Sequence, residues 1–120
     1  MHDLDEILAF LTNNIDGALA AAVGGMDGLL VEQHAPRGDD FSALAAEITN
    51  VLHSARTAYT NSLDAGNLKE LIVTADRLIG YTRMLGNDLF CIILLKPGGN
   101  IAKARLYSEQ ASKQILEVFV

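Results

Sequence analysis

The segment Leu89–Leu95, LFCIILL, is apolar at every position. A β-strand of this composition offers water no polar side chain on either face, so other elements have to cover both faces. Residues typical of turns bound the run, with Leu-Gly-Asn-Asp before it and Lys-Pro-Gly-Gly-Asn after it. The segment therefore predicts a sheet that carries helices on both of its faces.

Four further segments have the character of strands, because each is a short apolar or alternating run bounded by turn residues. They are residues 17–23, 29–33, 68–75 and 79–85. The first is rich in alanine, which suits a strand against which helices pack closely. A chain of 120 residues has room for one core of this kind, so residues 1–120 are expected to form a single domain.

Three helices complete the set of expected elements. Asp3 is placed to cap the first helix, and Asn100 is placed to cap the last one. A longer helix is expected from Phe41 to Leu63, with Asp39 or Asp40 as its N-cap. The order α-β-β-α-β-β-β-α predicts an α+β fold with a five-stranded, mostly antiparallel sheet and helices on both faces.

The glycine-rich stretch between the first two strands is predicted to be a hairpin turn. Its spacing differs from that of phosphate-binding and dinucleotide-binding loops, and it leads into a strand. No helix N-terminus therefore follows it to hold a phosphate. Gly25, Asp27 and Gly28 are residue types that tolerate the positive φ of a tight hairpin turn.

Several classes of function have no support in the sequence. A net charge of -6 with scattered basic residues argues against nucleic acid, and no apolar stretch is long enough for membrane insertion. Cys91 lies within the most apolar strand, and His2, His34 and His53 fall on separate segments without a chelating pair. We therefore expect a cytoplasmic, non-enzymatic protein without catalytic residues, metal or cofactor.

The helix expected at Phe41–Leu63 has two faces that both lack charge. One is an apolar stripe that is expected to cover the sheet: Phe41, Leu44, Ile48, Val51, Leu52, Ala55 and Tyr59. The opposite face carries small, uncharged side chains: Ala43, Ala46, Asn50, Ser54, Thr57 and Asn61. Glu47 and Arg56 are the only charged residues of this helix, and both are expected on its flanks.

Such a helix is predicted to pack against a second copy of the chain. Small, uncharged residues allow a close approach and avoid the cost of burying unpaired charge. The segment Leu71-Ile72-Val73 is expected in an edge strand without proline, and the same strand of a second copy would pair with it. The predicted homodimer interface therefore combines the small-residue face with Leu71, Ile72 and Val73. An exposed alanine-rich helix, or an edge covered by a helix or loop, remains the alternative.

The order of elements resembles the roadblock domain family, which includes dynein light chains and MglB-like bacterial regulators of Ras-like GTPases. The resemblance is carried by the hairpin GALAAAVGGMDGLLVE and by the block YTRMLGNDLFCIILLKPGGNIAKARL. It extends over nearly the whole chain, and profilin-like and longin-like domains share a similar layout. Ala102 departs from the pattern, because many members have glycine there.

The resemblance implies a homodimer built through the second helix and the third strand. It also implies that the paired helices form a platform for a small Ras-like GTPase, whose switch regions are reshaped without a catalytic arginine. On this chain the platform maps to Glu47, Asn50, His53, Ser54 and Arg56, with Arg56 expected in a salt bridge at the rim. Whether the GTPase is stimulated or only recruited stays open.

Two other functions fit the same sequence. One is a structural, light-chain-like subunit of a larger assembly. The other is a small-molecule sensor of profilin-like or PAS-like architecture, with a cavity between sheet and helix lined by Tyr81, Thr82 and Arg83. The apolar tail at residues 115–120 is expected either in the core or in an additional contact.

Overall fold

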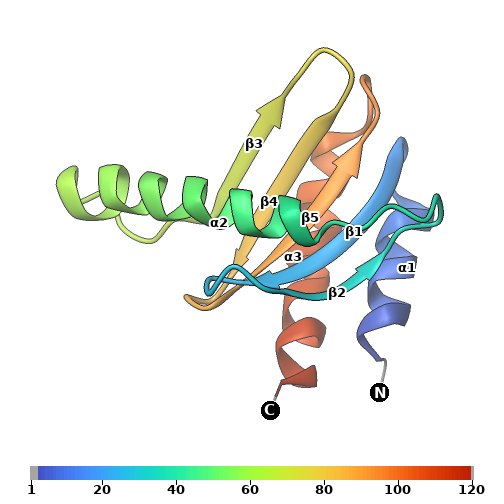
Figure 1. The fold of residues 1–120 in the computed structure, drawn as a ribbon, viewed down its shortest axis with the longest axis horizontal. Helices are drawn as coiled ribbons and strands as arrows, with labels where there is room; N and C mark the ends of the chain where they lie inside the picture. The colour runs from blue at the N-terminus through green and yellow to red at the C-terminus, as the bar shows by residue number, and fades with distance from the viewer. Residues whose placement is uncertain (1–2, 120) are drawn as a thin grey trace.

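A computed structural model describes residues 3–119, which form one five-stranded sheet and its covering helices (Figure 1). The strands are β1 (Ala18–Gly25), β2 (Leu30–His34), β3 (Glu70–Thr74), β4 (Ile79–Leu85) and β5 (Leu89–Leu95). The helices are α1 (Leu4–Asn14), α2 (Ser42–Ala55), a π-helix η1 (Arg56–Ser62) and α3 (Ile101–Val118). All four strand pairs are antiparallel, in the order β2-β1-β5-β4-β3, so the predicted fold class is confirmed.

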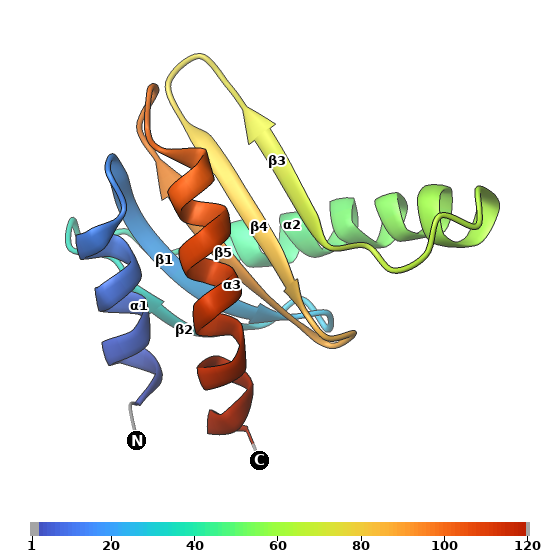
Figure 2. The same cartoon turned by 180° about the vertical axis from the view of Figure 1, so that it is seen from behind.

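The apolar strand β5 lies in the middle of the sheet and divides its side chains between two cores. Cys91, Ile93 and Leu95 belong to the core beneath α1 and α3. Phe90 and its neighbours on the other face belong to a smaller core beneath α2. Figures 1 and 2 show α2 on one side of the sheet and the antiparallel pair α1 and α3 on the other. The prediction of helices on both faces, made from LFCIILL, is confirmed.

Two of the three predicted helix caps are present. Asp3 Oδ1 accepts a hydrogen bond from the Glu6 amide at 2.8 Å, and Asn100 Oδ1 accepts one from the Lys103 amide at 2.9 Å. The predicted cap of the second helix is wrong, because its N-cap residue is Phe41, which makes no capping hydrogen bond. Asp40 accepts instead from the amide and hydroxyl of Ser42, one position before the cap.

The glycine-rich stretch is the predicted hairpin turn between β1 and β2. The Gly25 amide donates to the Leu29 carbonyl at 2.9 Å, and the Asp27 carboxylate accepts from the Leu29 amide at 3.1 Å. Of the three residues expected to tolerate positive φ, only Gly28 has it, at +89°. The turn is therefore closed locally, and no helix follows it.

A close contact between two turns joins the start of β1 to the end of β5. Gly17 has a φ of +85°, its carbonyl accepts from the Lys96 amide, and the Asp16 carbonyl accepts from the Asn100 amide, both at 2.9 Å. A Cβ atom at Gly17 would lie 2.7 Å from the Cα of Gly99. Only glycine fits here, because both the backbone conformation and the available space exclude a side chain.

The second helix is longer than the sheet that it covers. It is α-helical from Ser42 to Ala55 and continues as a π-helix from Arg56 to Ser62, so a single α-helix from Phe41 to Leu63 was the wrong expectation. Figures 1 and 2 show this continuation running past β3, beyond the edge of the sheet. No residue of η1 is buried. We call residues 56–63 the overhang.

Candidate functional site

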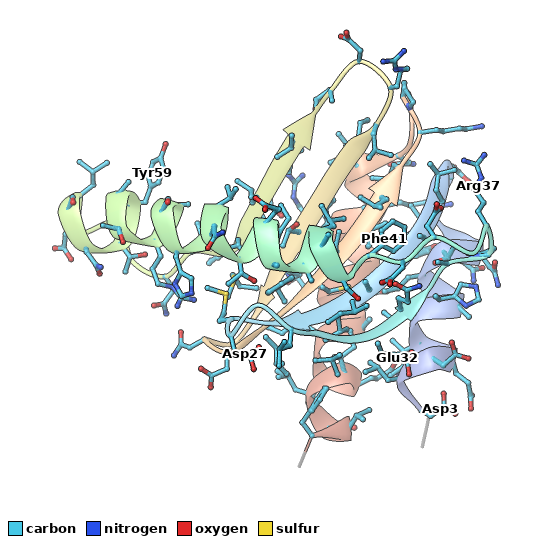
Figure 3. The ribbon with its side chains drawn as sticks, viewed as in Figure 1. Asp3, Asp27, Glu32, Arg37, Phe41 and Tyr59 are labelled. Atoms are coloured by element: carbon cyan, nitrogen blue, oxygen red, sulfur yellow. The ribbon has the colours of Figure 1, made fainter. Side chains whose placement is uncertain are left out.

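The face of α2 that contacts the sheet contains part of the predicted stripe. Leu52 is buried in the core beneath α2, and Phe41, Leu44 and Ile48 pack against that core. Ala45, Thr49 and Leu52 are its buried residues, at the spacing i, i+4, i+7. Val51 and Tyr59, which were predicted to cover the sheet, are 44% and 56% exposed. The buried side of the helix extends beyond the stripe to Ala45 and Thr49. Tyr59 lies on the overhang, far from the N-cap residue Phe41 (Figure 3). Apolar surface therefore remains uncovered along one side of this helix.

The outward face of the helix consists of small polar and apolar side chains. Its predicted interface residues are all exposed: Ala43, Ala46, Asn50, Ser54, Thr57 and Asn61. Glu47, four residues after Ala43 and three before Asn50, is exposed on the same side. Its expected position on a flank is therefore wrong, and this face carries one charge. This chain alone covers none of that face, and its contact with a second copy stays a prediction.

Two of the predicted platform residues tie the helix to the turns at one end of the sheet. His53 Nε2 lies 3.1 Å from the Met26 carbonyl in the β1–β2 turn. Arg56 Nη2 donates to the Asn87 carbonyl in the β4–β5 turn at 3.2 Å. Arg56 makes no ion pair within residues 3–119, and its expected salt bridge at the rim of the platform stays a prediction. The five predicted platform residues thus divide into an outward group and a pair of tethers.

The strand β3 is an edge strand, as predicted, and its outer edge is unprotected. Val73 on this strand is 47% exposed, and Ile72 is exposed beside it. The other edge strand, β2, is shielded, because the Glu32 carboxylate accepts from the neighbouring Gln33 amide at 3.1 Å. Charge and a local hydrogen bond at an edge discourage further strand pairing. Of the two edges, β3 is therefore the one open to another strand.

A network of charged side chains around Glu70 was missed by the sequence reasoning. Arg105 on α3 binds the Glu70 carboxylate through Nε and Nη2, with a shortest distance of 2.7 Å. The Tyr81 hydroxyl donates to the same carboxylate at 2.6 Å. The hydrogen bonds from Arg105 hold the pKa of Glu70 below its ordinary value of 4.5. No sequence signal identifies this pairing, because Glu70 and Arg105 lie far apart in the chain.

Replacement of Glu70 with glutamine is expected to lower the free energy of unfolding by about 1 to 2 kcal/mol at neutral pH, because a charged hydrogen-bonded pair is lost. The lowered pKa means that Glu70 stabilises the fold above pH 4.5 and that this contribution is lost as pH falls through its folded-state pKa. The difference between the two proteins should therefore shrink in acid. Urea unfolding at about pH 7 and about pH 3 measures it.

The matched control for this variant is Glu117→Gln. Glu117 is exposed, and among the described residues it has no ion-pair partner. This substitution should change the unfolding free energy little at either pH. A constant difference between Glu70→Gln and the original protein across the acid range would contradict the assigned role of Glu70.

The residues proposed for a sensor cavity do not line one cavity. Tyr81 and Arg83 lie on the α3 face of the sheet, whereas Thr82 lies on the α2 face. A hollow of about 150 Å³ beside α2 has Thr82 as the only polar residue of its lining.

The apolar tail at residues 115–120 lies only partly in the core. Ile115 is in the core, Leu116 to Phe119 are exposed, and Val120 is outside the described residues.

The remaining reactive side chains are not grouped into a site. Cys91 is fully buried, and burial raises the pKa of its thiol to about 12. Within residues 3–119, no three of the His, Cys, Asp and Glu side chains come together as a metal would require. His2 lies outside the described residues. No helix in the described part of the chain combines the length and apolar character needed to cross a bilayer.

Comparisons with known proteins agree on the fold. The sequence profile of the Roadblock/LC7 domain matches residues 4–94. No curated protein matches the sequence. A Roadblock/LC7 domain from Streptomyces avermitilis is similar in structure, with a TM-score of 0.89 and 19% identity over 98% of both chains.

Two further solved structures share the architecture at lower identity. The gliding protein MglB from Thermus thermophilus has a TM-score of 0.81 and 16% identity, over 98% of this chain and 93% of that one. Profilin IA from Acanthamoeba castellanii has a TM-score of 0.59 and 12% identity, over 98% of this chain and 100% of that one. Both likenesses concern the fold.

Proposed function

The chain belongs to the Roadblock/LC7 domain family, and we propose that it is a cytoplasmic, non-enzymatic adaptor that forms a homodimer and binds a small Ras-like GTPase. In this role it modulates the hydrolysis of GTP or the localisation of the GTPase. The observation that carries the proposal is the presence of two uncovered surfaces on the single chain. These are the outward side of the long helix and the open edge of β3.

In the proposed dimer, β3 of each copy pairs with β3 of the other around a two-fold axis. Support comes from the contrast between the two sheet edges, because only β2 is shielded by a carboxylate. The pairing extends the sheet across both copies and brings each overhang toward the partner's sheet. Exposed apolar side chains such as Val51, Tyr59 and Val73 then have a surface to pack against. Desolvation of this apolar area favours association.

The two helices of the dimer form the proposed platform for the GTPase. Glu47, Asn50 and Ser54 lie on its outward face and supply the polar contacts. His53 and Arg56 hold the platform in position, because each binds the helix to a turn of the sheet. A platform tethered in this way loses little conformational freedom on binding, which favours affinity.

Arg56 is proposed to position the platform rather than to enter the GTPase active site. Its substitution by alanine is expected to weaken GTPase affinity modestly and to leave stimulated GTP hydrolysis within about tenfold of the original rate. An arginine finger contributes roughly 10³- to 10⁵-fold. The Arg56 guanidinium instead donates a hydrogen bond to the Asn87 carbonyl. Single-turnover GTP hydrolysis at saturating adaptor measures the effect.

Arg77→Ala is the control for Arg56→Ala. Arg77 is an exposed arginine on the β3–β4 bend, and its loss should change neither affinity nor turnover. A loss of a thousandfold or more in turnover on Arg56→Ala alone would contradict the positioning role.

Affinity capture from native lysate, repeated with GTP and GDP analogues, tests the proposed function. Enrichment of a small GTPase that depends on the bound nucleotide supports it, and the outward-face variant Asn50→Arg should abolish that enrichment. Capture of a motor or membrane-complex subunit without nucleotide dependence would favour a structural light-chain role and contradict the GTPase role. The original protein should also sediment as a dimer at micromolar concentration.

A further inference from the structure

A surface hollow of about 520 Å³ lies between the overhang, the loop that leads to β3, and α3. None of its lining residues lies on α2, so it is separate from the outward face of that helix. Its charged and aromatic lining residues are Tyr59, Lys69, Glu70, Arg83, Arg105 and Glu109. A hollow of this volume is in the range that accommodates a small ligand.

Arg83 is a largely buried cation with few hydrogen bonds. Its side chain is 17% exposed, and its single hydrogen bond within residues 3–119 goes from Nη1 to the Tyr81 hydroxyl at 3.3 Å. Its contacts with the carboxylates of Glu70 and Glu109, at 3.9 and 4.0 Å, are too long for hydrogen bonds. A guanidinium has five N–H donors, so most of those of Arg83 have no protein acceptor among the described residues. An acceptor placed in the hollow would satisfy them.

The hollow is positive within a negative protein. Lys69, Arg83 and Arg105 are three of the nine lysines and arginines of the chain, against two carboxylates in the same lining, whereas the whole chain has a net charge of -6. The Glu70 carboxylate already accepts hydrogen bonds from Arg105 and Tyr81. Glu109 is 64% exposed and holds Arg83 only loosely, so an incoming anion can displace it.

We propose that this hollow binds the oxyanion of a small molecule, a phosphate or a carboxylate group. Arg83 supplies the main donors through Nη2 and Nε, and Arg105 adds Nη1, which makes no hydrogen bond among the described residues. Charge-assisted hydrogen bonds from guanidinium groups to oxyanions are strong and directional. Lys69 adds a positive charge at the rim. The proposal does not depend on the GTPase role.

Titrations with sodium phosphate and, separately, with sodium citrate test the proposal, with ionic strength held constant by sodium chloride. Saturable changes are expected in the NMR signals of the Lys69 and Glu70 amides and of Arg83 Nε–H. A response to phosphate alone or to citrate alone identifies which oxyanion the hollow prefers. The absence of a saturable change with both anions would overturn the proposal.

Three variants separate a specific site from general anion attraction. Arg83→Met should weaken binding by about tenfold or more, because charge-assisted hydrogen bonds are lost. Arg77→Met removes the same charge from a place outside the hollow and should leave binding unchanged. Glu109→Gln should tighten binding several-fold, a gain that an unfolded variant cannot produce. Equal effects of the two arginine variants, or no gain on Glu109→Gln, would overturn the proposal.

Discussion

Replacement of Val73 with lysine is expected to convert the proposed dimer into monomers, with an increase of at least about 100-fold in the dissociation constant. Val73 is 47% exposed in the single chain, so a lysine there remains solvated and the fold is kept. In the β3–β3 interface the ammonium group would lose its water without gaining a partner. An unpaired buried charge costs several kcal/mol, and each 1.4 kcal/mol is about tenfold in affinity. Sedimentation equilibrium measures the change.

Val31→Lys is the matched control for Val73→Lys. Val31 is 43% exposed and also lies on an edge strand, β2, at the opposite end of the sheet. The control variant should dimerise like the original protein, and both variants should keep the far-UV spectrum of the fold. Val73→Lys protein that dimerises with unchanged affinity would show that β3 is not the pairing edge.

Replacement of Gly17 with alanine is expected to lower the free energy of unfolding by about 3 kcal/mol. A left-handed backbone costs a residue with a Cβ about 1 to 2 kcal/mol. At Gly17 the new Cβ would also lie 2.7 Å from the Cα of Gly99, so the two turns have to move apart and their amide–carbonyl bonds are strained. Urea unfolding with a fixed m-value measures the loss.

Gly38→Ala separates the two causes of that loss. Gly38 has a φ of +82°, close to that of Gly17, but no atom lies within 4 Å of the position its Cβ would take. Its substitution should cost only the backbone contribution, about 1 to 2 kcal/mol. Equal losses for the two variants would contradict the contact between the turns as a source of stability.

The elements that depend on local pattern could be predicted from the sequence. LFCIILL predicted a strand covered on both faces, because seven apolar residues in succession place no polar side chain on either face. Asp3 and Asn100 were identified as caps because an N-cap carboxylate or amide bonds an amide three residues ahead. The edge position of β3 followed from the order of hairpins and from its place after the long helix.

The features that depend on contacts between distant segments could not be predicted in this way. A helical stripe gives the apolar side of a helix but not the line along which it meets the sheet, so Val51 was placed in the core although it is exposed. The sequence also does not indicate at which residue the helix extends past the edge of the sheet. That position determines whether Tyr59 is buried or exposed. The bonds of Arg56 to Asn87 and of Arg105 to Glu70 depend on segments brought together only by folding.

The central place of β5 determines the order in which the protein can fold during synthesis. Without β5 the sheet separates into two ribbons, β2–β1 and β4–β3, which share no hydrogen-bonded neighbour. A two-stranded ribbon alone is marginally stable in water, and pairing Ala18 with Leu95 closes a long loop of chain. During synthesis on the ribosome, the complete sheet therefore forms only after β5 has left the exit tunnel. Until then each ribbon has an inner edge without a hydrogen-bonded neighbour.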